Sequence, residues 1–170
     1  ISLVLNEEAY AGLGKILQTL GTLQLDRSRL QAVDARVRAE PGMDGKDLPA
    51  LQLELPTVPL SVRVFPGDLD DIVANLLRNA YGAITTGGRV GLAVAEAVDP
   101  ITGIAAVELR VRDTAPGEFT DATLHGQEIG RGLGLTTDLV ARHDGTVHVQ
   151  PEPGWSKAIG VSLRKGIGRA

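Results

Sequence analysis

The sequence predicts an α+β fold in which helices cover one face of a mixed, mostly antiparallel sheet. Three patterns support this expectation. Residues 68–83 carry apolar side chains at helical spacing, several short segments alternate apolar and polar residues, and a short turn at 99–103 joins two of those segments. Because an amphipathic helix and a half-buried sheet each have an apolar face to cover, we expect them to pack together as a two-layer sandwich.

The expected elements follow in chain order. A helix spans residues 7–39, although Gly12, Gly14 and Gly21 each weaken it by about 1 kcal/mol relative to alanine. After a break at 41–45 come strands 51–56 and 58–66, helix 68–83 with Asp68 as N-cap, strands 90–98 and 104–112, a polar loop at 117–130, helix 133–143, and strands 146–150 and 158–164. This order divides the chain into an N-terminal helical segment, residues 1–45, and an α+β domain, residues 46–170.

The composition is that of an ordinary globular domain. The 170 residues are 43% hydrophobic and 22% charged, and the net charge of −4 argues against a nucleic-acid-binding surface. The absence of cysteine excludes disulfides and thiolate metal sites. No apolar run reaches the length of about 18 residues that a membrane-spanning helix needs, and we expect no membrane contact from this segment. Because the chain begins with Ile1 and not Met, we expect it to be a fragment.

Two asparagines distinguish the helix expected at residues 68–83. Asn75 and Asn79 are four residues apart, which places both amides on one face, one turn from each other. An amide carbonyl is a neutral oxygen ligand that suits a hard cation held by phosphates. The alternative is a pair of exposed or capping amides.

Two further motifs follow the asparagine helix. The strand that contains VELRVRD ends at Asp113 and runs directly into a turn, TAPG. Further on, GRGLGL at residues 130–135 precedes an apolar-periodic run. Glycines that open a helix allow backbone N–H groups to approach a phosphate, and the helix dipole favours that contact. The alternative is a flexible turn before a helix.

The order of these motifs resembles the ATP-binding domain of the GHKL superfamily, and within it the catalytic domain of bacterial sensor histidine kinases. NLLRNA resembles the N box, DTAPG the first glycine box and GRGLGL the second, and LVARHDGTVHV is similar to the segment that follows them. The resemblance covers residues 50–165. It implies the two-layer fold expected above and the cofactors ATP and Mg²⁺.

The resemblance also implies roles for individual residues. Asn75 and Asn79 would hold Mg²⁺ and the phosphates, and Asp113 would accept a hydrogen bond from the adenine amino group. Gly117 would leave room for the base, and residues 118–129 would form the ATP lid. The second box would lie at the phosphates through Gly130, Arg131, Gly132, Leu133 and Gly134. Its alignment is open, because counting back from His143 places GRGL in the box where the motif itself places GLGL.

The implied reaction is transfer of the γ-phosphoryl group to a histidine. Asp71, one turn before Asn75, is the candidate catalytic residue that would polarise the attacking imidazole, and the alternative is a solvated carboxylate at the helix start. ATP-hydrolysing relatives carry a glutamate where this chain has Asn75, so transfer is favoured over hydrolysis. The expected partners are a histidine-containing dimerisation domain, in the same or a partner chain, and a response regulator, in the cytoplasm.

Two departures from the family pattern leave alternatives open. Ala115 stands where the first box has glycine, and Gly82 stands where many members have a basic residue. One alternative is a degenerate domain that serves as a nucleotide-binding or non-catalytic interaction scaffold. Another is an anti-sigma-type serine kinase, which would need a carboxylate at position 75.

Overall fold

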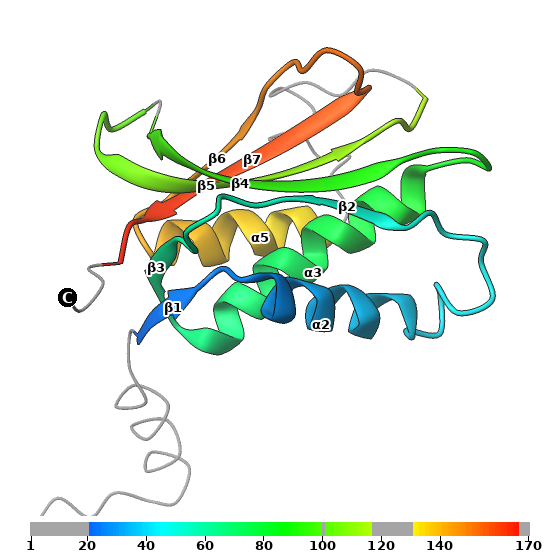
Figure 1. Ribbon diagram of the computed structural model, residues 1–170, viewed down its shortest axis with the longest axis horizontal. Coiled ribbons are helices and arrows are strands. Elements are labelled where there is room, and N and C mark those ends of the chain that lie inside the picture. The colour runs from blue at the N-terminus through cyan, green and yellow to red at the C-terminus, as the bar shows by residue number, and fades with distance from the viewer. Residues whose placement is uncertain (1–20, 100, 117–130, 167–170) are drawn as a thin grey trace, which may run out of the picture.

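The computed structural model describes residues 21–99, 101–116 and 131–166. A sheet forms one layer, and helices cover one of its faces (Figure 1). The elements are β1 (Gly21–Gln24), α2 (Arg27–Arg38), β2 (Leu51–Glu54), β3 (Ser61–Val64), α3 (Pro66–Ala83), β4 (Val90–Val98), β5 (Ala105–Asp113), α5 (Arg131–Arg142), β6 (Thr146–Val149) and β7 (Lys157–Arg164). No helix in the described ranges combines the length and apolarity needed to cross a membrane.

The main sheet has five strands in the order β2-β4-β5-β7-β6. Only the β2–β4 pair is parallel, and the other neighbours are antiparallel. The predicted α+β class with a mixed, mostly antiparallel sheet is therefore confirmed. The expected hairpin between β4 and β5 is present, and Asp99 Oδ1 closes it by accepting backbone hydrogen bonds from Ile101 and Thr102.

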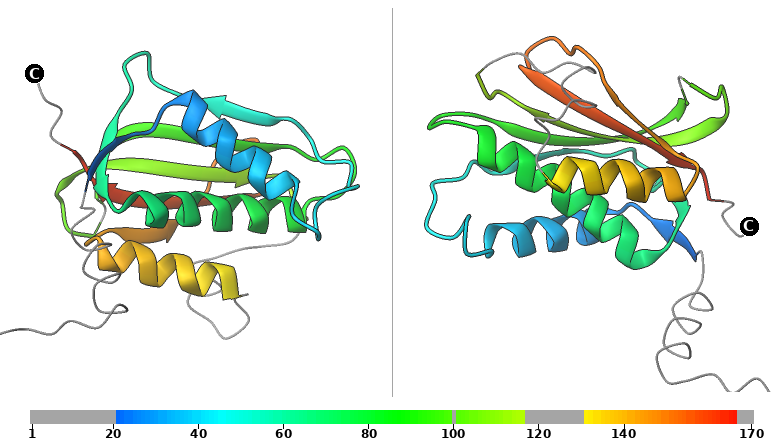
Figure 2. Two further views of the ribbon diagram at one scale, coloured as in Figure 1. Left: turned by 90° about the horizontal axis from the view of Figure 1, so that it is seen from below. Right: turned by 180° about the vertical axis from the view of Figure 1, so that it is seen from behind.

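Helix α3 lies between α2 and α5 under the sheet (Figure 2). Its core-facing side chains are fully or nearly fully buried: Leu69, Ile72, Val73, Leu76, Leu77, Ala80 and Tyr81. The predicted N-cap is wrong. The cap is Phe65, and Pro66 occupies the first turn, where its missing N–H costs nothing and its fixed φ suits the helix. Asp68 instead contacts His143, the residue after α5, with 2.7 Å between Oδ2 and Nε2, and so ties α3 to the end of α5.

The N-terminal helix predicted over residues 7–39 is wrong at residues 21–26. Gly21–Gln24 form β1, which pairs antiparallel with β3 in a separate two-stranded sheet. The helix proper starts after Asp26, whose Oδ1 accepts a hydrogen bond from the Arg29 backbone N–H at 2.8 Å. Residues 7–20 lie outside the described residues. Three side chains of α2 join the same apolar core as the sheet: Leu30, Val33 and Val37.

A buried tyrosine joins α2 to α3. The Tyr81 hydroxyl donates to Asp34 Oδ1 at 2.5 Å and accepts from Arg38 Nη2 at 2.8 Å, and Arg38 Nε donates to Asp34 Oδ2 at 2.8 Å. Burial first, and then the Asp34 carboxylate, raise the pKa of Tyr81 well above its ordinary value. The hydroxyl therefore stays protonated and keeps its donor role.

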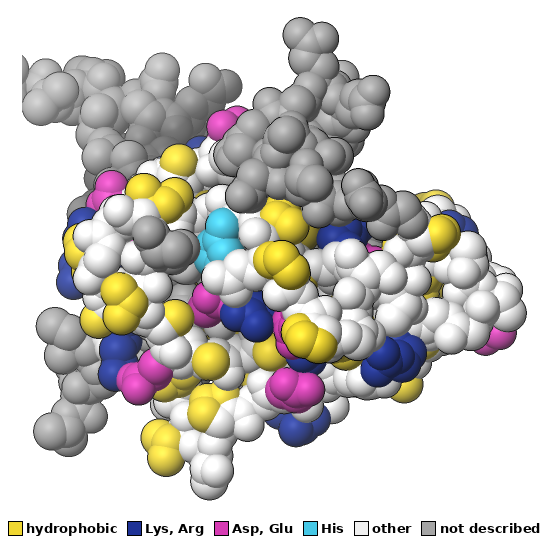
Figure 3. All heavy atoms as spheres, turned by 90° about the horizontal axis from the view of Figure 1, so that it is seen from above, with side chains coloured by type: hydrophobic (Ala, Val, Ile, Leu, Met, Phe, Trp, Pro, Cys, Tyr) yellow, Lys and Arg dark blue, Asp and Glu magenta, His cyan; other side chains and the backbone are white. Residues whose placement is uncertain are grey.

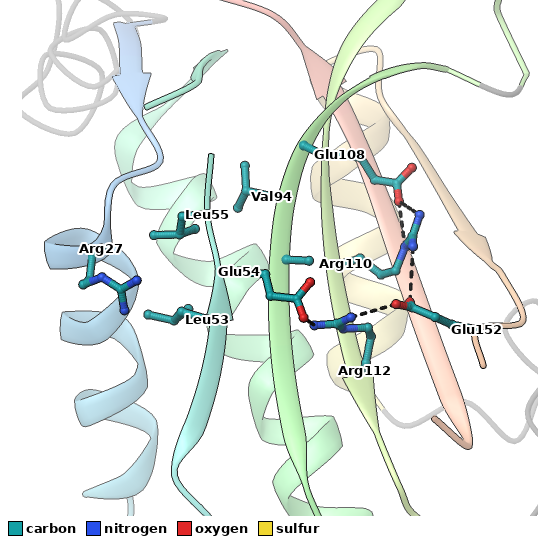
Figure 4. A pocket seen from close by; sticks show the side chains of 11 residues that line it. Arg27, Leu53, Glu54, Leu55, Val94, Glu108, Arg110, Arg112 and Glu152 are labelled. Atoms are coloured by element: carbon teal, nitrogen blue, oxygen red, sulfur yellow. Dashed lines mark hydrogen bonds and ion pairs between the residues drawn. The ribbon is translucent and has the colours of Figure 1, made fainter. Parts of the chain in front are cut away.

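The sheet face opposite the helices carries charged side chains of both signs (Figure 3). In a hollow of about 520 Å³ on this face, Arg110 pairs with Glu108 and Glu152, and Arg112 pairs with Glu152 and Glu54 (Figure 4). Arg112 is buried, with 3% of its surface exposed, so its pairing with carboxylates is required. Because these arginines are already neutralised, the hollow has little charge left with which to attract a phosphate.

The Glu108 carboxylate lies on this face among charged neighbours. The neighbouring His148 ring and then Arg110 hold the pKa of Glu108 below its ordinary value, against the opposing effect of burial. His148 Nε2 lies 3.6 Å from Glu108 Oε2, an ion-pair distance and not a hydrogen bond.

We predict that Tyr81→Phe destabilises the fold by about 1–2 kcal/mol, because it removes a hydroxyl that both donates and accepts in a buried site. Urea unfolding should show a lower midpoint with an unchanged slope. Val58→Ala, at a side chain that is 73% exposed, serves as the control and should leave the midpoint unchanged. Equal midpoints for the wild type and the phenylalanine variant would contradict the role given to this hydroxyl.

We predict that Glu108 contributes to acid unfolding. A lowered folded-state pKa gives stability that is present above the unfolded-state value, near 4.5, and is lost as the pH falls through the folded-state value. Urea midpoints measured from pH 7 downward should therefore fall less steeply for Glu108→Gln than for the wild type. Parallel pH profiles for the two proteins would count against this prediction.

Candidate functional site

Asp113 is the last residue of β5 and lies at the centre of the candidate site. Its side chain is 1% exposed. Oδ1 accepts a hydrogen bond from the Ala115 backbone N–H at 2.9 Å, so the carboxylate itself closes the turn that follows the strand. The other oxygen, Oδ2, receives no hydrogen bond from any described residue. A buried carboxylate oxygen without a donor has a place for one more hydrogen bond.

Lys157 lies next to Asp113 on the neighbouring strand. The two residues are direct partners in the antiparallel register of β5 and β7, and Ser156 N donates to the Asp113 carbonyl at 2.9 Å. The Lys157 ammonium is 3.2 Å from Asp113 Oδ2, an ion pair whose geometry is not that of a hydrogen bond. The same ammonium donates to Asn79 Oδ1 at 2.8 Å. Lys157 therefore links the asparagine helix to the end of β5.

The two asparagines of α3 have different partners. Asn79 Oδ1 accepts from Lys157, whereas Asn75 Oδ1 accepts from Arg78 Nη1 at 2.6 Å. Arg78 also makes two hydrogen bonds to Glu40, of 2.7 and 2.6 Å, which hold its guanidinium in place. The structure thus brings Asn79 and Asp113 together, while Asn75 is held toward the segment that follows α2.

The expected Mg²⁺ does not fit this arrangement of donors. Each amide oxygen that would ligate the ion already accepts a hydrogen bond from a cationic side chain, Arg78 or Lys157. Within the described ranges, no group of three or more histidine, aspartate or glutamate side chains could hold a metal ion either. The donor set supplies positive charge where a divalent cation would need negative charge.

Asp71, the candidate catalytic residue, lies on the surface of α3. Its side chain is 59% exposed, and one carboxylate oxygen is 3.7 Å from Arg36 of α2. An exposed ion pair of this kind contributes little energy. Its proposed action on an imidazole remains a prediction.

Residues 131–135 of the second glycine box belong to the start of α5. The helix begins at Arg131, so Gly132 and Gly134 lie inside it and not in a preceding loop. Leu133 is 4% exposed and belongs to the apolar core, whereas a side chain added at Gly134 would meet nothing within 4 Å. Gly117, Gly130 and the expected lid at 118–129 lie outside the described residues. Phosphate binding by this box remains a prediction.

Lys157 was not among the site residues predicted from the sequence. Its position at the start of an alternating segment marks the beginning of a strand, but the alternation does not say which residue of another strand it faces. The alternation of β7 could have identified it, because Lys157 points to the same face of the sheet as the buried Ile159 and Val161. A lysine on the buried face of a strand needs a carboxylate partner.

Comparison with known proteins shows the fold. The sequence matches no protein-family model and no curated protein. Among solved structures, the mycobacterial sensor histidine kinase MprB is similar with a TM-score of 0.63 and 20% identity, over 85% of this chain and 98% of that chain. The nucleotide-free catalytic domain of histidine kinase ThkA has a TM-score of 0.64 and 13% identity, over 85% and 97%.

A third similar structure is the Acinetobacter baumannii histidine kinase AdeS, with a TM-score of 0.61 and 15% identity, over 96% of this chain and 87% of that chain. All three share the arrangement of the helices and the sheet at low sequence identity. This chain therefore has the fold of the catalytic domains of sensor histidine kinases.

Proposed function

We propose that this chain is the ATP-binding catalytic domain of a two-component sensor histidine kinase that acts in the cytoplasm. ATP would bind between α3 and the end of β5, beside Asn79 and Asp113. The γ-phosphoryl group would pass to a ring nitrogen of a histidine on a dimerisation helix, in the same or a partner chain, with release of ADP. A response regulator would then accept the phosphoryl group.

The observation that carries this proposal is the second carboxylate oxygen of Asp113, which is ion-paired with Lys157 but accepts no hydrogen bond from the described residues. Oδ2 is buried and receives no hydrogen bond from the described residues, so an exocyclic amino group of a purine would satisfy it. The oxygen is fixed in direction, because the Ala115 backbone N–H holds Oδ1. A rigid, buried acceptor discriminates between a base that donates and one that does not.

The side chains of α3 support transfer over hydrolysis. Position 75 holds an amide, which cannot take a proton from water as a carboxylate could. The site therefore has no general base on this helix turn for activating water. Catalysis would consist of positioning ATP and the incoming imidazole.

A second candidate function is nucleotide binding without catalysis, with the domain serving as an interaction scaffold. The contacts of Lys157 with Asn79 and of Arg78 with Asn75 favour it. Both amides are held by the protein's own cations and would have to be released before they could contact a metal ion.

We predict that the purine amino group is recognised by Asp113. Calorimetry should show that ATP binds about tenfold or more tightly than inosine triphosphate, which lacks the amino group, and that Asp113→Asn removes most of this preference. Asp144→Asn is the matched control, since Asp144 is an exposed carboxylate 3.5 Å from Arg164. Equal affinity of the wild type for the two nucleotides would sink the proposed role of Asp113.

We predict that the full-length protein that contains this chain autophosphorylates on histidine. Incubation with labelled ATP should give a phosphoprotein that is labile in acid and stable in base, and Asn79→Ala should slow its formation about tenfold or more. An acid-stable phosphate would favour a serine kinase. ATP binding without any transfer would favour the scaffold.

A further inference from the structure

Lys157 occupies the part of the site where a bound metal ion is expected. Its side chain is only 9% exposed, and its ammonium lies between Asn79 of α3 and Asp113 of β5. The cross-strand register places Lys157 directly opposite Asp113, so the contact is set by the backbone pairing of β5 with β7. The strand register therefore fixes where this side chain starts, and its ammonium forms part of the site.

A divalent cation on Asn79 would be repelled by this ammonium. An ion bound to Asn79 Oδ1 at about 2.1 Å would lie within about 5 Å of Lys157 Nζ, which is itself 2.8 Å from the same oxygen. Two positive charges this close repel each other strongly in a site shielded from water. The oxygen also has its electron density drawn toward the ammonium and is a weaker ligand for that reason.

The second amide offers no alternative. Asn75 Oδ1 accepts from Arg78, whose guanidinium is fixed by its two hydrogen bonds to Glu40. Among the described residues, Lys157 and Arg78 contact the two amides, and each cation is paired with a carboxylate, Asp113 or Glu40. These two cations and two anions leave no net negative charge to attract a metal ion. The site supplies its own positive charge at both asparagines.

We propose that the nucleotide site of this chain binds ATP without a divalent metal ion, with the Lys157 ammonium providing the positive charge beside Asn79. This inference rests on the proposed ATP binding and concerns its metal requirement. Lys157 would neutralise part of the charge of the nucleotide while Asp113 Oδ2 accepts from the base. Arg78 would keep Asn75 out of metal coordination.

The test is calorimetric titration of the whole chain with ATP, in excess Mg²⁺ and in excess EDTA. For the wild type, we expect dissociation constants that differ by less than about threefold between the two conditions. Lys157→Met keeps the length of the side chain and removes its charge, which leaves Asp113 and Asn79 able to attract a metal ion. In this variant, Mg²⁺ should tighten ATP binding by about tenfold or more.

Two further variants separate charge from folding. Lys157→Arg keeps the positive charge and should keep the metal independence. Lys165→Met removes a lysine that pairs with Glu96, outside the site, and should behave as the wild type. Should Lys157→Met fail to fold, the comparison of Mg²⁺ with EDTA in the wild type and in the arginine variant still decides the matter.

The outcomes are distinguishable. Wild-type binding that tightens tenfold or more with Mg²⁺ would overturn this inference and leave the proposed ATP binding in place. Absence of ATP binding in both conditions would overturn the proposed function and this inference with it. Equal binding in Mg²⁺ and EDTA, with metal dependence appearing only on loss of the charge at position 157, supports the inference.

Discussion

The antiparallel pairing of β5 with β7 is the constraint on which the site depends. It sets Asp113 opposite Lys157 and thereby puts a carboxylate and an ammonium, both almost fully buried, within 3.2 Å of each other. Either charge alone would be costly in this position, and removal of one partner of such a pair typically costs about 3–5 kcal/mol. The same pairing brings the Lys157 ammonium within hydrogen-bond distance of α3, where Asn79 supplies the third contact. One strand register therefore determines both the electrostatics of the site and its attachment to the central helix.

The two faces of the sheet carry different kinds of side chain. Toward the helices, Val107, Leu109 and Val111 of β5 are buried in the apolar core. On the opposite face, Arg110 and Arg112 of the same strand pair with glutamates. Because β5 alternates between these faces, Asp113 falls on the helix side, where the asparagines are. The charged network and the candidate nucleotide site are therefore separated by the thickness of the sheet.

Much of the fold could be predicted because its signals are local. The apolar spacing of α3 and the alternation of β4 and β5 each lie within one segment, and the structure confirms them. The strand at Gly21–Gln24 could not be predicted, because it exists only by pairing with β3, some 40 residues further along the chain. The cap of α3 was misplaced because Asp68 is a good capping residue, but Pro66 already fixes the start of the helix.

The candidate site was predicted less completely than the fold. Asn79 and Asp113 were identified from their motifs, and the structure places both around one ammonium. That ammonium was missed, since the contact of Lys157 depends on strand register, which no single segment of the sequence contains. The pairing of Arg78 with Glu40 was missed for a similar reason. It joins α3 to the segment that follows α2, and the spacing of the asparagines along α3 does not predict it.

The small sheet at the start of the described chain has a mechanical consequence. β1 is hydrogen-bonded to β3, and only Phe65 separates β3 from the first residue of α3. β3 also meets the end of β7, through a bridge between Val62 and Lys165. A force on the backbone before Gly21 would therefore act on β3 directly. Through β3 it would act on the start of α3 and on the end of β7, the strand that carries Lys157. Tension on the chain before Gly21 would reach both sides of the candidate nucleotide site through a single strand, β3.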